Sequence, residues 1–181
     1  MKVVFAVFIL SLGTSASAFA WDGDRQGFLL GVGAGTINKV VANDNESVWN
    51  FAQATGNSRI GYAFDSKNAI LLYSQGLYSI NAGTIESFNA TYTGLNYQNW
   101  SKDEPQSSTK FIGFGVIGIS AGYSYEGKSR IEPEYGFGVN FGYGREVVKH
   151  TSIELNIVTG YIPEYKEFLF GISTTFNILG Y

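Results

Sequence analysis

The single histidine of this 181-residue chain lies two residues before a serine and four before a glutamate. Imidazole, hydroxyl and carboxylate are the groups of a nucleophilic triad, in which the histidine takes the serine proton. Residues two apart share one face of a β-strand, so Ser152 and Glu154 point the same way. We expect both to point inward, away from a lipid substrate. A catalytic pair of His150 and Ser152 therefore remains an alternative, and we assign no catalytic residue.

Two other sequence patterns resemble ligand-binding motifs but lack the structural context or the spacing that such motifs need. Residues 113–118 match the glycine pattern that holds a dinucleotide, a chemistry that needs a turn leading into a helix. Here the glycines lie inside an alternating strand pattern. The acidic stretches 43–46 and 103–104 lack the ligand spacing of a calcium loop. We predict no cofactor-binding and no metal-ligating residues, and hence no cofactor.

Most of the chain alternates between bulky apolar and small residues with a period of two, which indicates β-strands. The clearest case is 134–144, where Gly and one Asn separate aromatic residues and Val. Four further segments repeat the pattern: residues 28–35, 110–116, 152–157 and 168–178. The outward residues predicted in these five strands are Phe28, Leu30, Val32, Ala34, Ile112, Phe114, Val116, Tyr135, Phe137, Val139, Phe141, Tyr143, Ile153, Leu155, Ile157, Phe168, Phe170, Ile172, Phe176 and Ile178. Lys110 is assigned to the glycine side of its strand.

Three weaker strands complete a predicted set of eight. Residues 58–64 place Ile60, Tyr62 and Phe64 outward, opposite Arg59, Gly61 and Ala63. Residues 89–98 place Leu95 and Tyr97 outward. Residues 69–78 are apolar on both faces near their start. In that segment we assign Leu71, Tyr73 and Leu77 outward, with Ser74 and Gly76 inward.

The predicted connections fall into two groups, one at each end of the strands. Short or polar turns follow the second, fourth and sixth strands: residues 65–68, 101–108 and 145–149. Loops form the other group: residues 36–56, 81–88, 123–131 and 162–165. The first loop contains Trp49 and Phe51, and residues 48–51 are a candidate extension of the second strand. An even number of strands places both chain ends on the side of the turns, which is the periplasmic side of a membrane barrel.

The composition of the two faces favours lipid over water as the surroundings. A face of Gly, Ser, Thr and Asn suits the crowded interior of a narrow barrel, while the bulky face meets hydrocarbon. Arg59 and Glu154 are predicted to lie inside, with Glu132 or Glu134, and such buried charges must pair. Six tyrosines near strand ends suit a girdle at the membrane interfaces: Tyr62, Tyr73, Tyr97, Tyr135, Tyr143 and Tyr161.

The first twenty residues have the layout of a secretory signal peptide. Lys2 precedes an apolar run over residues 3–12, and small residues occupy Ala18 and Ala20. We expect cleavage after Ala20 or after Ala18, so that residues 21–181 form one domain. The chain has no Cys and carries 15 acidic against 12 basic residues without a basic cluster in its sequence, which argues against nucleic acid as a partner.

The chain resembles the small outer-membrane β-barrel proteins of Gram-negative bacteria, the class of the OmpA transmembrane domain and the OmpX-like barrels. The resemblance rests on the opening residues 27–35, the hairpin from Tyr135 to Tyr161 and the aromatic last strand. It implies an all-β fold, an eight-stranded antiparallel up-and-down transmembrane β-barrel in the outer membrane. Members usually end on an outward aromatic residue, whereas Tyr181 falls on the opposite parity from Phe176.

The expected role is an envelope-structural one or surface interaction through the extracellular loops, without enzymatic activity and with an unidentified surface ligand. The expected partners are outer-membrane lipid, lipopolysaccharide and the outer-membrane assembly machinery, and we expect a monomer. Three alternatives stay open. One is a lipid A deacylase-like enzyme, since a family of such enzymes is similar in carrying a His-x-Ser pair, although Ile153 and Glu154 replace its following Asn-Ala. The others are a soluble lipocalin-like binding barrel and a small channel.

Overall fold

The computed structural model describes residues 25–42, 47–78, 89–102, 107–120, 124–125, 128–129, 134–164 and 166–181. The expected signal peptide, both cleavage positions, Glu132 and the acidic stretches 43–46 and 103–104 lie outside the described residues.

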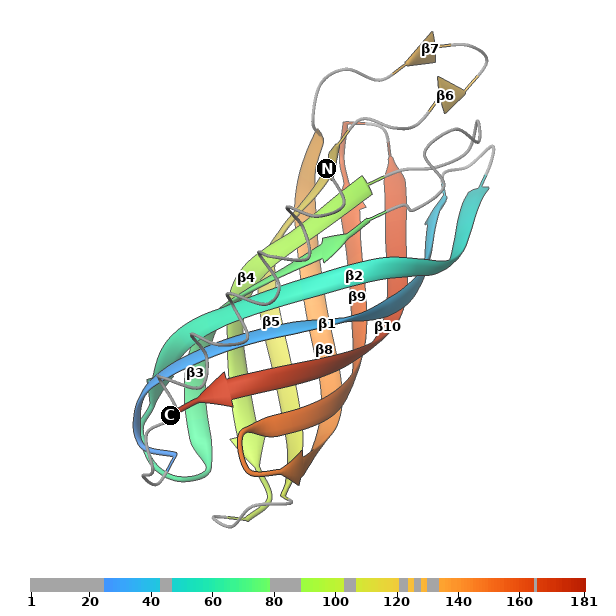
Figure 1. The fold of residues 1–181 in the computed structure, drawn as a ribbon. Helices are drawn as coiled ribbons and strands as arrows, with labels where there is room; N and C mark the ends of the chain where they lie inside the picture. The colour runs from blue at the N-terminus through green and yellow to red at the C-terminus, as the bar shows by residue number, and fades with distance from the viewer. Residues whose placement is uncertain are drawn as a thin grey trace, which may run out of the picture.

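Eight strands form a closed barrel in which every neighbouring pair is antiparallel (Figure 1). Each strand of the barrel pairs with the next barrel strand in the sequence. The last strand closes the barrel on the first, and their pairing runs from Leu30 opposite Gly180 to Ala42 opposite Phe168. The strands are β1 (Gly27–Ala42), β2 (Ser47–Ala63), β3 (Asn68–Leu77), β4 (Asn89–Trp100), β5 (Ser108–Ser120), β8 (Glu134–Val148), β9 (Thr151–Ile162) and β10 (Glu167–Gly180). The predicted all-β, eight-stranded up-and-down barrel is confirmed.

A separate two-stranded sheet lies in the connection between β5 and β8. It pairs β6 (Ser124–Tyr125) with β7 (Lys128–Ser129), and Figure 1 shows it beyond the end of the barrel that is opposite to the C-terminus. This sheet was not predicted. Within the described ranges, no helix has the length and apolarity that a membrane span requires.

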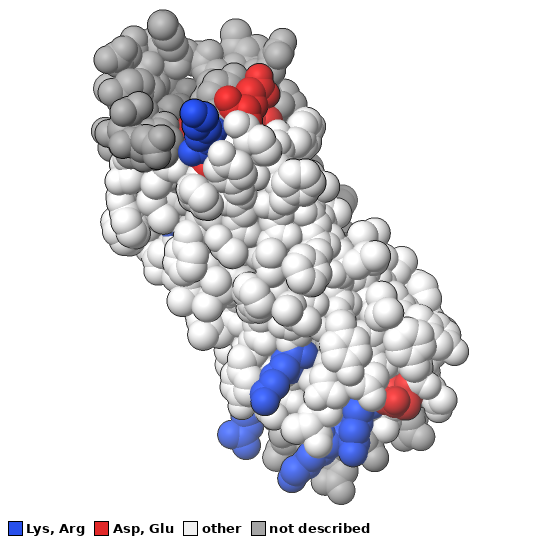
Figure 2. All heavy atoms as spheres, turned by 180° about the vertical axis from the view of Figure 1, so that it is seen from behind, with Lys and Arg blue, Asp and Glu red and all other residues white. Residues whose placement is uncertain are grey.

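The wall of the barrel is apolar outside and largely polar or small inside. Phe114, Phe137 and Leu95 are 62–75 % exposed on the outer face, whereas Glu154 and Asn177 on the inner face are fully buried. The predicted outward residues of β1, β2, β4, β5, β8, β9 and β10 are confirmed. Figure 2 shows the middle of the rear face as a broad band free of charged side chains.

The inner glycines keep the barrel narrow because bulky side chains from other strands occupy the space above them. A Cβ on Gly142 would lie 1.7 Å from the ring of Phe111, which reaches across from the neighbouring strand β5. A Cβ on Gly138 would meet Ile117 at 2.6 Å. A side chain at either position would collide with an existing one, so the interior is already filled there.

The interior has three layers between the turns and the loops. At the turn end lies an apolar cluster of Leu29, Ala63, Ala69, Leu71, Trp100, Leu179 and Tyr181. At the loop end lies a second cluster of Ile37, Val41, Tyr73, Leu77, Ala90, Tyr92, Ile117, Ile119, Val158, Ile162 and Leu169. Polar side chains that include Arg59 and Glu154 fill the layer between the clusters.

The orientation predicted for β3 is wrong. Leu71, Tyr73 and Leu77 are buried inside, and the outward residues are Ile70 and Leu72, which are 45–49 % exposed. Both faces of this segment are apolar, so its period alone does not decide the orientation. The register decides it, because Tyr73 pairs with the inward-facing Arg59. Ser74 lies on the outward side with Ile70 and Leu72, and so does Gly76, where a Cβ would meet the ring of Tyr78. Tyr73 therefore does not belong to the predicted tyrosine girdle.

The predicted loop 36–56 is also wrong, because most of it is a hairpin of β1 and β2. Pairing continues to Ala42 opposite Ser47, across an irregularity between Ile37 and Lys39. Ala52, with a φ of 50°, occupies this bulge. Polar residues on both faces hide the alternation, and the bulge shifts its parity. The candidate extension at residues 48–51 is confirmed.

Two smaller assignments at the turn end change as well. Strand β8 continues to Val148, so the turn is Lys149–His150 rather than 145–149. Lys110 lies on the outer face, since it shares the parity of Ile112 rather than that of the glycines. Arg145 is exposed on the outer face of β8.

Candidate functional site

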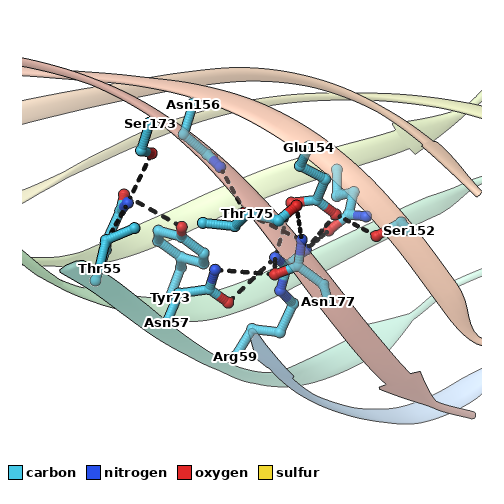
Figure 3. Close-up of polar contacts among 12 residues, drawn as sticks. Thr55, Asn57, Arg59, Tyr73, Ser152, Glu154, Asn156, Ser173, Thr175 and Asn177 are labelled. Carbon is cyan, nitrogen blue, oxygen red and sulfur yellow. Dashed lines mark hydrogen bonds and ion pairs between the residues drawn. The ribbon is translucent and has the colours of Figure 1, made fainter. Parts of the chain in front are cut away.

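A buried ion pair lies in the middle polar layer and joins opposite walls of the barrel (Figure 3). Arg59 of β2 donates from Nη1 to Glu154 Oε1 at 3.0 Å and from Nη2 to Oε2 at 2.8 Å, a two-pronged contact. Both side chains are at most 1 % exposed. The predicted pairing of these two charges inside the barrel is confirmed. It follows from the alternation of side chains along each strand, which turns both Arg59 and Glu154 inward.

Amide and hydroxyl groups add further hydrogen bonds to this pair. Arg59 Nη2 also donates to Asn177 Oδ1 at 3.0 Å, and Asn57 Nδ2 donates to the same oxygen at 2.9 Å. Ser152 Oγ donates to Glu154 Oε1 at 3.0 Å. The guanidinium carbon lies 5.3 Å from the ring centre of Tyr73. These contacts stabilise two charges that would be very unfavourable alone in a dry interior.

The network continues from the ion pair toward the loop end through uncharged groups. Gln75 Nε2 donates to Thr55 Oγ1 at 3.0 Å and to Ser173 Oγ at 2.9 Å, and Tyr73 donates to Gln75 Oε1 at 3.3 Å (Figure 3). Glu134 does not share the layer of Glu154. It pairs with Ile119 at the loop end of β8, whereas Glu154 lies opposite Gly144 near the turns. Glu134 is 5 % exposed, so its predicted inward orientation is confirmed, at a different level of the barrel from Glu154.

A second buried ion pair lies at the turn end, where Arg25, just before β1, and the last residue of the chain meet the wall. Arg25, which precedes β1, pairs with Glu146 of β8, and each side chain is 2 % exposed. Arg25 Nη1 donates to the carbonyl of Lys102 at 2.8 Å. Glu146 Oε1 accepts from the Tyr181 hydroxyl at 2.9 Å and from the backbone N–H of His150 at 3.2 Å. This clamp ties three separate segments and the last residue together.

Aromatic rings cover the clamp from inside the barrel. The guanidinium carbon of Arg25 lies 5.5 Å from the ring centre of Trp100 and 5.8 Å from that of Tyr181. Burial, and then the charge of Glu146, raise the pKa of the Tyr181 hydroxyl, so that it remains a donor. Tyr181 is 4 % exposed, whereas Phe176 is 52 % exposed, which confirms that these two residues have opposite parity.

Sequence reasoning missed this clamp, although one signal was present. Glu146 continues the even-numbered inward series of 134–144, but the expected turn at 145–149 interrupted that series. Arg25 precedes the alternating pattern, so its position has no sequence signal that we can identify.

The three residues of the hypothetical triad have different surroundings in the structure. His150 occupies the turn between β8 and β9 with a φ of 66°, and its ring centre lies 4.4 Å from that of Tyr181. Ser152 is 1 % exposed and donates to Glu154, as expected for two inward residues. Glu154 in turn holds Arg59. The serine and the carboxylate are thus members of the buried network.

The glycine string that resembles a dinucleotide motif is not followed by the turn and helix that the motif needs. Residues 113–118 lie wholly inside strand β5. No cluster of three or more potential metal ligands occurs among the described residues.

An aromatic pair is exposed on the β1–β2 hairpin at the loop end. Trp49 and Phe51 stack with ring centres 5.9 Å apart and an interplanar angle of 11°, and they are 57 % and 63 % exposed. The indole N–H donates to the Ser47 hydroxyl at 3.2 Å. Both residues lie within the predicted loop 36–56, in the part at 48–51 that was a candidate extension of the second strand, and the structure places them on β2.

Comparisons with known proteins find similarity at the level of structure. No protein-family model matches the chain, and no curated protein matches it in sequence. Neisserial surface protein A is 13 % identical, with a TM-score of 0.57 over 84 % of this chain and 96 % of the other. Ail, the attachment invasion locus protein of Yersinia pestis, crystallised with the heparin analogue sucrose octasulfate, is 12 % identical, with a TM-score of 0.57 over 84 % of this chain and 99 % of that one.

A third solved structure is the N-terminal β-barrel domain of OprF from Pseudomonas aeruginosa. It is 10 % identical, with a TM-score of 0.50, and the match covers 83 % of this chain and 97 % of that domain. At such low identities the likeness concerns the fold. Together with the closed eight-stranded topology and the apolar outer face, it shows that the chain has the fold of the small outer-membrane β-barrels.

Proposed function

We propose that the protein is an integral outer-membrane barrel without enzymatic activity that contributes to envelope structure and presents its loop end for surface interaction. The observation that carries this proposal is the filled interior. The middle layer is occupied by the Arg59–Glu154 network, and apolar clusters occupy the layers on both sides. A barrel of eight strands packed in this way offers its ends, rather than a lumen, for contact with other molecules.

The β1–β2 hairpin is the part of the loop end best suited to such contact. Strand β1 has 16 residues, which at about 3.3 Å per residue and a tilt of about 45° spans roughly 35–40 Å along the barrel. The apolar band of an outer-membrane barrel is only about 25 Å tall. Trp49, which pairs with Val40 near the far end of β1, therefore stands at or beyond the outer membrane surface.

Single cysteines test this orientation, because the chain has no cysteine of its own. Ser47 at the hairpin and Ser101 at a turn are both exposed. We expect a membrane-impermeant maleimide to label Ser47→Cys in intact cells and Ser101→Cys only after lysis. The reverse pattern, or labelling of neither in intact cells, would contradict the proposed orientation.

The surface role predicts a contribution of Trp49 and Phe51 to cell-surface hydrophobicity. We expect cells that carry Trp49→Ser/Phe51→Ser to partition less into n-hexadecane than wild-type cells. The matched control is Leu72→Ala/Leu95→Ala, two apolar residues on the outer face within the lipid band. If the control lowers partitioning as much as the hairpin variant, the aromatic pair has no special role at the surface.

The proposal of a non-enzymatic role rests on the positions of His150 and Ser152. Lipid A mass spectra of cells with and without His150→Ala test it. We expect identical spectra, because Ser152 is engaged with Glu154 inside the wall. A loss of acyl-chain processing in the variant would revive the lipid-modifying enzyme. A small channel is tested by planar-bilayer recordings of the purified protein. We expect no discrete conductance steps, and reproducible steps would contradict a filled interior.

We further propose that the outer-membrane assembly machinery recognises β10 through its outward aromatic residues, and that the barrel functions as a monomer. Phe168, Phe170 and Phe176 are 43–61 % exposed on the outer face of this strand. Tyr181, which points inward to Glu146, does not contribute to this face. Phe176→Ala should slow assembly in cells, whereas Tyr181→Phe should not.

A further inference from the structure

Basic side chains that are scattered through the sequence gather at the turn end on one side of the barrel. They are Lys67, Lys102, Lys110, Arg145 and Lys149, and all are exposed. Asp65 is the exposed acidic residue at this end among those the structure describes. Figure 2 shows several basic side chains at this end of the rear face, below an uncharged band. The sequence shows no basic cluster because the residues come from two strands and three turns.

Two of these residues lie on the wall itself rather than in a turn. Lys110 of β5 pairs with Tyr143, and Arg145 of β8 pairs with Ser108, so the two cations are diagonal neighbours on adjacent strands. Such neighbours are about 7–8 Å apart between their backbones, within reach of long side chains. Neither forms an ion pair with a described acidic residue. Two like charges at this distance repel each other unless an anion lies between them.

The position of the pair relative to the apolar band identifies the anion. The next outward residues toward the barrel centre are Ile112 on β5 and Tyr143 on β8, followed by Phe114 and Phe141. The stems of Lys110 and Arg145 can lie along this apolar surface while their charged heads remain at the level of lipid headgroups. The cations thus suit a phosphate, and the apolar surface beside them suits hydrocarbon chains. A soluble polyanion would contact the cations but not the apolar surface.

We propose that Lys110 and Arg145 bind the phosphate of an anionic phospholipid in the leaflet that faces the turns, with Lys149 adding positive charge beyond them. The guanidinium offers a planar fork that matches a phosphate, and the ammonium adds a point charge. The acyl chains lie along Ile112 and Phe114. This inference rests on the proposed membrane location of the barrel.

Lipid selectivity of the refolded protein tests the inference. The full mature chain is refolded into phosphatidylcholine vesicles that contain trace amounts of spin-labelled phosphatidylglycerol or spin-labelled phosphatidylcholine. The fraction of immobilised label reports association with the barrel surface. We expect roughly a fivefold to tenfold preference for phosphatidylglycerol at 0.15 M salt, because each basic residue near the surface attracts an anionic lipid.

Two charge-matched variants locate the preference. Lys110→Gln/Arg145→Gln should reduce it to less than about twofold. Lys67→Gln/Lys102→Gln removes the same charge from the same end but from the turns, and should leave most of the preference intact. Heat-modifiable migration in each sample shows that the barrel is folded.

The outcomes separate this inference from the proposed function. A folded wild-type barrel without preference overturns the lipid site alone. Equal losses in the two double variants also overturn it, since they would show attraction to the overall charge of this end. A chain that inserts into no vesicle overturns the membrane location, and the lipid site with it.

Discussion

The inner and outer faces of the barrel wall reverse the usual distribution of side chains in a folded protein. Inside, Arg59, Glu154 and Asn177 are at most 2 % exposed, whereas outside, Phe114 and Phe137 are 68 % and 75 % exposed. In water, an outer face of this kind would be an aggregation hazard. The difference teaches that this wall is built for a polar, filled interior and, under the proposed function, for surrounding hydrocarbon. Each prediction below alters one face or one end of the barrel.

The largest effect is expected from Glu154→Ala in the interior. Arg59 would then keep only amide oxygens, such as those of Asn57 and Asn177, as partners for its charge. Removal of one partner of a buried ion pair costs about 3–5 kcal/mol of unfolding free energy. Urea unfolding of the protein refolded in lipid vesicles measures this loss.

The control for this change removes both charges. Arg59→Met/Glu154→Leu leaves no uncompensated charge, so we expect it to unfold at a higher urea concentration than Glu154→Ala. If the double variant is less stable than the single one, the cost of Glu154→Ala does not come from the uncompensated charge of Arg59. That result would contradict the role proposed for the ion pair.

The next effect is expected from Phe114→Arg on the outer face. Phe114 lies at the middle of β5, so its replacement places a charge near the centre of the bilayer. The expected cost is about 2–4 kcal/mol in vesicles. Phe114→Leu, which stays apolar, is the control. Unchanged stability of the arginine variant would indicate that this face meets water.

A smaller effect is expected at the clamp of the turn end. After Arg25→Ala, Glu146 still accepts from the Tyr181 hydroxyl and the His150 N–H, so its charge keeps two donors. We expect a loss of about 1–3 kcal/mol, less than for Glu154→Ala. The same urea titration measures both. A larger loss than for Glu154→Ala would place the main electrostatic contribution at the barrel end.

The smallest effect concerns the exposed turn between β2 and β3. The Asn68 side-chain amide and the backbone N–H groups of Lys67 and Asn68 hold the pKa of Asp65 below its usual value. Because the folded pKa is lowered, this contribution is present above the unfolded pKa of about 3.9 and is lost as pH falls through the folded pKa. Asp65→Ala should therefore destabilise the protein slightly at neutral pH and not in strong acid. A difference independent of pH would contradict this.

The parts of the fold that could be predicted are those where the two faces differ in chemistry. In β8 every second residue is bulky, as it is in β10 apart from Thr174, and the orientations of both strands are confirmed. Strand β3 could not be oriented, since it is apolar on both faces and only the pairing of Tyr73 with Arg59 decides. The β1–β2 hairpin could not be recognised because polar residues interrupt the alternation on both faces and the bulge at Ala52 shifts its parity.

The same reasoning explains which site residues were predictable. Arg59 and Glu154 stand out as charges on an inward parity otherwise occupied by small residues, so their pairing follows from the pattern. Arg25 lies before the first strand, where no period applies, and its contact with Glu146 depends on the three-dimensional placement of two segments far apart in the sequence. The basic pair of Lys110 and Arg145 likewise depends on the pairing of β5 with β8.

The central claim, a closed barrel in the outer membrane, is tested most directly by fractionation followed by gel migration with and without boiling. The account predicts that the protein is recovered in the outer-membrane fraction and that the unheated form runs at a different position from the boiled one. A single band at the same position before and after boiling, recovered in the soluble periplasmic fraction, would contradict it.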